Sequence, residues 1–462
     1  MRSAMPRKSR RKKKKANMSE TTLMLLQDLL KKAKSFGATS ADVVLSDSSS
    51  VSINRRLGKP ESVHRAEEAD IGLRVFVGKR SAIVSSSDRD PAALAEMAER
   101  AVAMARCVPE DPFAGIADPS EIAKIFPELD LYDTAEVSVE KMNDFADRAE
   151  GAARSIKGVT NSDGAEFGCG KDTVYYVASN DFVGSYSSSG YSLSVSVIAG
   201  EDTGMETDSD FDSAVFLADL KDPETIGRSA GERAVKALKP RKVATQQVPV
   251  VFDNRISGGL IGSLAGAISG AAVARGTTLL KDKMGAQIFS SGITIMDDPF
   301  LKRGNRSHPF DGEGVTPQKR AIIDKGVLTG WLLDLGSARQ LGLKTTGNAA
   351  RGAGSPPTPK PSNFYMQPGD VTFDALIKDI EKGFFVTQMM GNGGNIVTGD
   401  YSRGARGFWI EAGKVSYPVA ELTIAGNLMD MWRSCAPAND LELKYGIDAP
   451  SLRIDGMTVA GA

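Results

Sequence analysis

The sequence predicts an α+β protein with an N-terminal two-layer α/β part and a C-terminal, β-rich, barrel-like domain that holds a buried helix. Three observations predict this class. In the N-terminal half, helical segments flank runs of strand-like residues twice, which gives a repeated helix–β-meander–helix pattern. From Val248 onward, short strand-like runs alternate with glycine-rich turns. Between Arg255 and Arg275 lies an uncharged segment in which glycine recurs every four residues.

The first repeat, residues 18–110, begins with an amphipathic helix over residues 21–36, and Gly37 ends it as a C′ residue. Pro91 begins a second, alanine-rich helix. Between the two helices we expect strands at 41–46, 50–57, 62–77 and 80–86. Residues 111–130 contain three prolines and are predicted to form a linker.

The second repeat, residues 131–245, has the same order of elements. A helix is expected over residues 137–156, and another begins at Pro223. Strand-like runs between them lie at 159–161, 166–169, 173–179, 182–189 and 191–200. Each repeat is therefore predicted to form a sheet that helices cover on one side.

The C-terminal domain, residues 246–462, is predicted to be rich in short strands. Hairpins are expected around the turns at 324–326 and 411–414. Residues 352–361 contain four prolines and indicate a loop, and a short helix is expected within 371–380.

The uncharged segment, residues 256–274, is predicted to form one helix. Gly258, Gly262, Gly266 and Gly270 would line a single stripe on it, and each costs roughly 1 kcal/mol relative to alanine. Close packing against another element would offset that cost. A membrane span is the alternative, since small residues at this spacing also pack helices in bilayers. Few Leu or Ile residues and no flanking Trp or Tyr favour the buried, soluble helix.

Charge is divided unevenly along the chain. The 462 residues carry a net charge of −1, but residues 1–17 hold nine Lys or Arg and no acid. We expect this basic tail to be disordered. It could bind nucleic acid or anionic lipid, or translation could start at Met18. The remainder has 48 bases against 58 acids, which argues against nucleic acid as the main partner.

Three scattered cysteines and the lack of an apolar secretory segment favour a cytoplasmic protein with reduced thiols. Metal ligands are scarce. A catalytic zinc ion needs three protein ligands, and the chain has two histidines, His64 and His308, neither with a second histidine three to five residues away. The pair Asp311 and Glu313 could bind a hard cation from a loop. We predict no metal site in this chain.

A family resemblance rests on the strand at 248–252, the glycine-striped helix, and the blocks 391–400 and 407–411. Together they resemble the TldD/PmbA family. In its TldD-type members the matching helix carries His-Glu-x-x-x-His, which binds catalytic zinc. Here the two histidines and the glutamate are replaced, and Cys435 falls within about one residue of the third ligand. The positions that match this lost zinc motif are Gly262, Ser263, Ala267 and Cys435.

This pattern is that of the PmbA (TldE)-type subunit, which lacks the metal. The resemblance implies a cytosolic zinc metallopeptidase that degrades or processes unfolded peptides, such as leader segments and small labile proteins. This chain would shape the peptide cavity. A TldD-type paralogue, in a heterodimer or larger assembly, would supply zinc, so no cofactor is expected here and no membrane partner.

Two questions remain open from the sequence. The glycine-rich loop could present N–H groups to a peptide or partner, or it could simply form a turn; its residues are Gly391, Asn392, Gly393 and Gly394. The chain itself could instead be a homo-oligomeric peptide-binding or scaffold protein, or a hydrolase with an unrecognised site.

Overall fold

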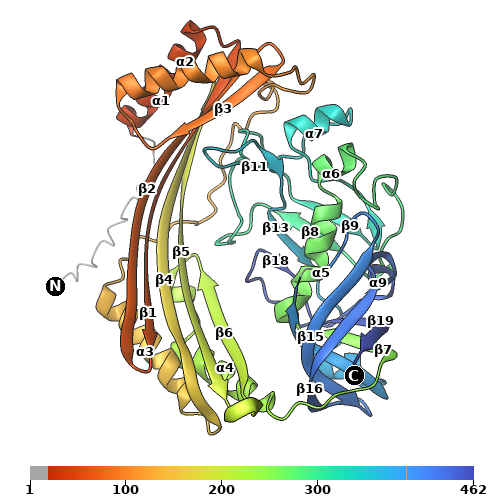
Figure 1. The fold of residues 1–462 in the computed structure, drawn as a ribbon. Helices are drawn as coiled ribbons and strands as arrows, with labels where there is room; N and C mark the ends of the chain where they lie inside the picture. Colours follow the sequence, from red (N-terminus) through yellow and green to blue (C-terminus); the bar gives the residue numbers. More distant parts are fainter. Residues whose placement is uncertain (1–18, 392, 462) are drawn as a thin grey trace, which may run out of the picture.

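The computed structural model describes residues 19–391 and 393–461 (Figure 1). The predicted basic tail and Asn392 lie outside the described residues. The N-terminal part is built on one antiparallel sheet of strand order β3-β2-β1-β4-β5-β6. Its strands are β1 (Ser40–Arg56), β2 (Lys59–Val77), β3 (Arg80–Ser86), β4 (Val159–Ala178), β5 (Val183–Ala199) and β6 (Glu206–Ala214).

The two predicted sheets are in fact one, because β1 of the first repeat pairs with β4 of the second. Their register runs from Asp42 opposite Ala178 to Arg55 opposite Ala165. Several short predicted strands also fuse into strands of up to 20 residues. Serine- and glycine-rich stretches within them have weak strand propensity, so the sequence suggested breaks where the sheet continues.

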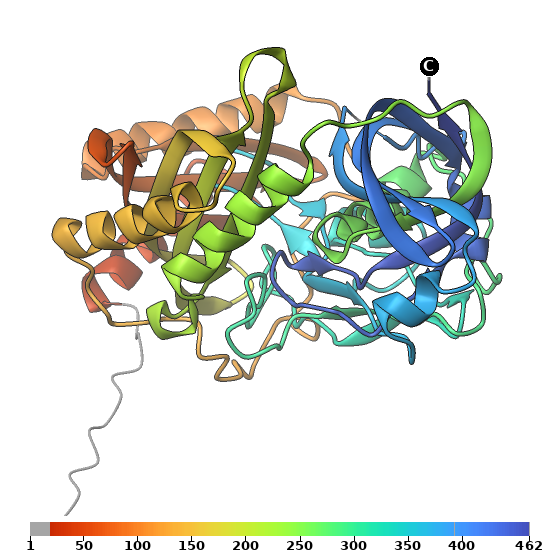
Figure 2. The same ribbon diagram turned by 90° about the horizontal axis from the view of Figure 1, so that it is seen from below.

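Four helices cover one face of this sheet. α1 (Glu20–Ser35) and α2 (Pro91–Cys107) pack on one end of it, and α3 (Val139–Arg154) and α4 (Pro223–Lys236) pack on the other. The opposite face is turned toward the C-terminal domain (Figures 1 and 2). There Tyr176, Phe182 and Phe310 form an aromatic cluster between the two parts.

The C-terminal domain contains a closed barrel of five strands, as the predicted barrel-like domain requires. The strand order is β16-β15-β14-β7-β19, and β19 pairs back with β16. The strands are β7 (Gln246–Phe252), β14 (Lys382–Met390), β15 (Asp400–Glu411), β16 (Lys414–Asn427) and β19 (Leu452–Ala460), and β17 (Ala436–Pro437) extends this sheet beside β19. The predicted hairpin at 411–414 joins β15 to β16.

A second, five-stranded sheet lies beside the barrel. Its order is β10-β9-β8-β13-β18, made of β8 (Ile295–Asp298), β9 (Arg320–Asp324), β10 (Val327–Leu328), β13 (Asn363–Met366) and β18 (Ile447–Asp448). The predicted hairpin at 324–326 joins β9 to β10. The remaining elements are η1 (Asp202–Gly204), η2 (Leu217–Asp219), α7 (Leu335–Gln340), β11 (Ala349–Ala350), β12 (Thr358–Pro359), α8 (Phe373–Ile377) and α9 (Leu428–Ser434).

The glycine-striped segment is broken into two helices, α5 (Asn254–Ala267) and α6 (Gly270–Ala274). At the break, Gly270 N donates to Leu332 O at 2.7 Å. A Cβ on Gly258 would lie 2.4 Å from Ile447 O, and one on Gly270 would lie 2.5 Å from Ser337 Oγ. A Cβ on Gly262 would meet no heavy atom within 4 Å. The stripe therefore packs tightly at its two ends and is open in its middle.

Within residues 19–391 and 393–461, no helix has both the length and the apolar composition needed to cross a bilayer.

A buried charge network joins the sheet to the C-terminal domain. Asp42 on β1 accepts hydrogen bonds from Arg74 Nε and Nη2 at 2.8 and 2.6 Å and pairs with Arg351 through its other oxygen. Arg74 also pairs with Glu313 at 3.1 Å, and Glu313 accepts from Leu335 N at 2.9 Å. All four charged side chains are at most 8% exposed. The network spans two N-terminal strands and two C-terminal loops.

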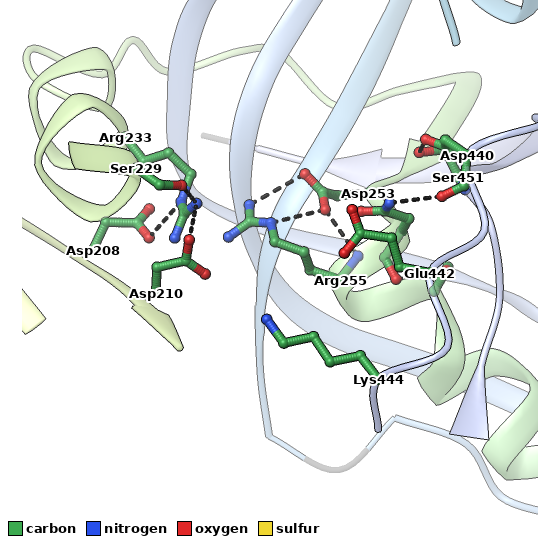
Figure 3. Close-up of polar contacts among 12 residues, drawn as sticks. Asp208, Asp210, Ser229, Arg233, Asp253, Arg255, Asp440, Glu442, Lys444 and Ser451 are labelled. Carbon is green, nitrogen blue, oxygen red and sulfur yellow. Dashed lines mark hydrogen bonds and ion pairs between the residues drawn. The ribbon is translucent and has the colours of Figure 1, made fainter. Parts of the chain in front are cut away.

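Strand β6 contributes a second set of charged contacts. Glu206, Asp208, Asp210 and Asp212 alternate in sequence and so share one face of the strand. Their partners are Arg406 with Glu206 at 2.9 Å, Arg233 with Asp208 and Asp210 at 3.2 and 3.4 Å, and Lys444 with Asp212 at 3.2 Å. Figure 3 shows part of this region, where Arg255 and Lys444 approach from the C-terminal domain. The sequence did not predict β6, because Asp is depleted in strands.

We expect Asp42→Asn to destabilise the protein by about 3–5 kcal/mol, because Arg351 and Arg74 would stay buried without their counter-charge. Burial raises the pKa of Asp42, but Arg351 and Arg74 outweigh burial and hold the pKa below its ordinary value. This carboxylate therefore stabilises the fold above the unfolded pKa of about 4 and ceases to do so as pH falls.

Urea unfolding of the wild type and Asp42→Asn between pH 3 and 7 checks this prediction. The variant should lose part of the pH dependence in the acidic range. Asp47→Asn on the same strand is the control, because its pair with Arg89 is 37% exposed on both sides and should contribute at most about 1 kcal/mol. Equal effects of the two substitutions would refute the assignment.

The open middle of α5 gives a matched pair of glycine substitutions. Gly258→Ala should destabilise strongly, because its Cβ would collide with a backbone carbonyl at 2.4 Å. Gly262→Ala has free space and should stabilise the helix by up to about 1 kcal/mol. Chemical denaturation midpoints of both variants test this, and a shift in the same direction for both would contradict it.

Candidate functional site

The open middle of α5 is where two predicted groups of site residues meet. Gly262 and Ser263 are half-buried, and Gly266 is exposed. A Cβ on Gly394 would lie 3.1 Å from Ser263 Oγ, and one on Gly266 would lie 3.8 Å from Ile396 Cγ2. The glycine-rich loop therefore passes directly beside the helix positions that match the lost zinc motif.

Internal hydrogen bonds hold the glycine-rich loop. Gly393 O accepts from Ser402 N at 2.9 Å, and Asn395 N donates to Asp400 O at 2.8 Å. Gly391 has φ +77°, a left-handed conformation that glycine adopts without strain. A Cβ on Gly393 would lie 2.3 Å from Arg403 Cδ, so the loop and this arginine are in close contact. Backbone conformation explains the glycine at 391, and close contacts explain those at 393 and 394, while Asn392 lies outside the described residues.

Arg403 is a residue that the sequence did not single out. It lies on β15, and its Nη1 is 4.0 Å from the position of a Cβ on Gly259, so it lines the open face of α5. Its Nε is buried without a hydrogen-bond partner among the described residues. The guanidinium can bind a carbonyl or carboxylate beside the helix. A single arginine that follows a serine matches no sequence motif. Its position beside α5 can therefore be recognised only from the fold.

The other two motif positions are buried in the core. Ala267 is fully buried, and its carbonyl accepts from Thr278 Oγ1 at 2.7 Å. Cys435 is 4% exposed, and its thiol donates to Trp432 O at 3.3 Å. Burial raises the pKa of Cys435 to about 12. The thiol is therefore neutral at physiological pH and is a poor metal ligand or nucleophile.

The open face of α5 carries no activated nucleophile. Ser263 Oγ donates to Gly259 O at 3.3 Å, which is a bond within the helix. His64 is exposed on β2, and His308 Nδ1 lies 3.0 Å from Arg306 O in a distant loop. Among the residues that the structure describes, no group of three His, Cys, Asp or Glu side chains could hold a metal ion.

The carboxylate pair Asp311 and Glu313 has a structural role instead of the cation site considered from the sequence. Asp311 accepts backbone N–H groups of Glu313, Val315 and Ala349 at 2.9, 2.9 and 3.1 Å. Glu313 pairs with Arg74 in the buried network. All four carboxylate oxygens accept hydrogen bonds from the protein and so hold loops together.

A cleft between the sheet and the C-terminal domain was also missed by sequence analysis. Three neighbouring cavities of about 400, 360 and 270 Å³ lie along the face of the sheet that the helices leave uncovered. Tyr186, Arg306 and His308 line both larger cavities. Tyr186, Ser188 and Gly190 alternate along β5, so they share one face of the strand. This alternation is the sequence feature that could have indicated which residues line the cleft.

Comparison with known families covers nearly the whole described chain. Three family models match: domain 1 of the PmbA/TldA metallopeptidases at residues 41–105, their central domain at 132–238, and their C-terminal domain at 245–461. The chain is 39% identical to metalloprotease PmbA of Escherichia coli O157:H7, over 91% of this chain and 92% of the relative. It is 35% identical to a PmbA homologue of Haemophilus influenzae, over 96% and 99% of the two chains.

Solved structures agree with this assignment. A candidate modulator of DNA gyrase from Bacteroides thetaiotaomicron superposes with a TM-score of 0.88 at 29% identity, covering 96% of this chain and all of the other. TldE of Thermococcus kodakarensis shares the fold, with a TM-score of 0.83 at 21% identity and coverage of 95% and 100%. With three family domains matched in order, this chain belongs to the PmbA/TldD family of metallopeptidases.

Proposed function

We propose that this chain is the non-metal subunit of a two-chain, cytosolic zinc metallopeptidase that acts on unfolded peptides. One observation carries the proposal. The helix positions where TldD-type members are expected to bind zinc hold Gly262, Ser263 and Ala267 here, on an otherwise family-typical strand and helix. Glycine and alanine have no donor atom, so these positions do not fit zinc and no catalytic step runs through a metal held by this chain.

This chain's own residues would form walls for an extended peptide. The open face of α5, the loop at 393–396 and Arg403 offer backbone groups and a cation beside the helix. A TldD-type partner would supply zinc and the general base, which polarise the scissile carbonyl and activate water. The three free cysteines are compatible with a reducing cytosol.

Peptide hydrolysis by mixed subunits tests the proposal. An unstructured peptide should stay intact with this chain alone. Hydrolysis should rise above that of a zinc-loaded TldD-type chain when the two are mixed, because the second subunit completes the cavity. Hydrolysis by this chain alone that a chelator abolishes would overturn the proposal. No effect in either case would favour the homo-oligomeric peptide-binding or scaffold protein.

Restoring the motif in this chain should fail. We expect Gly262→His, Ser263→Glu and Ala267→His together to give no zinc-dependent hydrolysis. Ala267 is fully buried, so a histidine there would overpack the core, and no outer groups are placed to orient the new ligands. Zinc-dependent hydrolysis by a folded triple variant would contradict the prediction, and Gly262→Ala serves as the control for the tolerance of α5.

A further inference from the structure

The cleft between β5 and the loop at 301–311 has a charge pattern that the proposed function does not use. Its cavity of about 400 Å³ lies within the size range of small-ligand sites. Besides two tyrosines, the ionisable residues that line it are Arg306, His308, Asp311, Arg351 and Lys360. Three of these five are arginine or lysine, in a chain that carries a net charge of −10 beyond residue 17.

Two of the cations have no counter-charge in contact. Arg351 is neutralised by Asp42 in the buried network. Arg306 and Lys360 are exposed, and neither forms an ion pair within 4.0 Å among the residues described in the structure. Asp448 attracts Arg306 from farther away, but its two oxygens already accept Tyr445 N and Gly446 N at 2.8 and 3.0 Å.

Among the described residues, Asp311 is the one acid in the lining of this cavity. Asp311 accepts three backbone N–H groups, as described above. Burial, together with the nearby Glu313, raises the pKa of Asp311 to about 7. A pKa of about 7 leaves Asp311 only partly ionised at neutral pH, so Arg306 and Lys360 are the lining charges that have no counter-charge in contact. Two such cations favour an anionic group beside them.

Two neutral side chains complete the polar lining. Burial raises the pKa of the Tyr186 phenol to about 12, so its hydroxyl stays protonated and can donate a hydrogen bond. His308 Nδ1 lies 3.0 Å from Arg306 O, which orients the imidazole ring; we assign the proton to Nδ1, which leaves Nε2 unused by this contact. Both residues also line the adjoining cavity of about 360 Å³.

The adjoining cavity continues the cleft with small polar groups. Ser188, Ser189, Gly190 and Ser213 line its wall. Asp172 also lines it; its carboxyl accepts a hydrogen bond from Ser46 Oγ at 3.0 Å, and burial raises its pKa. A pocket with two unpaired cations that adjoins a second cavity of about 360 Å³ has room for an extended peptide with an anionic end, and not only for a compact anion.

We propose that Arg306 and Lys360 bind a carboxylate of a peptide that lies in the cleft between β5 and the 301–311 loop. This inference rests on the proposed function, since it assumes a peptide as the ligand. Lys360 is a flexible point charge, and Arg306 can bind both oxygens of a carboxylate. The Tyr186 hydroxyl, which lines both cavities, can donate a further hydrogen bond.

Fluorescence anisotropy on this chain alone tests the site with one labelled, unstructured peptide in two forms. The form with a free C-terminal carboxylate should bind about tenfold more tightly than its C-terminal amide, which corresponds to about 1.4 kcal/mol. Arg306→Gln combined with Lys360→Gln should abolish the difference. Lys302→Gln should retain it, because Lys302 is an exposed cation of the same loop outside the cavity linings.

Equal affinity for the acid and amide forms, no binding of either form, or an unchanged preference in the double variant would overturn the proposal. A third peptide, amidated but with a terminal glutamate, separates the two sources of the carboxylate. If it binds like the free acid, the site recognises any terminal carboxylate. If it binds like the amide, the site is specific for the main-chain carboxylate. Both results support carboxylate binding.

The mixing experiment and the binding experiment together distinguish this inference from the proposed function. If mixing with a TldD-type chain fails to raise hydrolysis while the carboxylate preference persists, the subunit proposal fails and this site remains. If mixing raises hydrolysis but the wild type ignores the carboxylate, the site is disproved and the subunit proposal remains. Thermal unfolding of the double variant should match the wild type, since both side chains are exposed.

Discussion

The ion pair between Asp42 and Arg351 is the constraint on which the relation between the two parts of the molecule depends. It is fully buried and joins one end of the N-terminal sheet, near the start of β1, to a C-terminal loop. Arg74 extends it to Glu313, whose other oxygen holds the start of α7. A buried pair costs much desolvation, so its benefit here is specificity: only one docking of the two parts keeps every charge paired.

The charged face of β6 fixes the same docking at the opposite end of the sheet. Its acids meet Arg406 and Lys444 from the C-terminal domain. With the parts held at both ends, a cleft remains along the uncovered face of the sheet, beside the aromatic contact of Tyr176, Phe182 and Phe310.

Sequence reasoning succeeded where local patterns determine structure. Helix starts, the two C-terminal hairpins and the alternation of helices and strands follow from prolines, glycines and apolar periodicity. It failed where strand pairing is non-local, because no pattern in β1 indicates that β4 is its neighbour. It also failed at β6, where acidic residues made a strand prediction unfavourable. At the candidate site, motif positions 262 and 263 fell on the open face of α5 beside the glycine-rich loop, but Arg403 and the cleft depend on elements far apart in sequence.

The pairing of β1 with β4 has a consequence during synthesis. Asp42 faces Ala178, so the inner edge of β1 can be covered only after well over a hundred further residues have been made. Until then the nascent meander of β1, β2 and β3 exposes a long unpaired edge, the kind of surface that recruits foreign strands. β1 has serines at 46, 48, 49, 50 and 52, which make this unpaired edge polar and reduce its tendency to bind other strands. The serines at 48 and 49, where the sequence suggested a break between two strands, would thus help to protect the growing chain from aggregation.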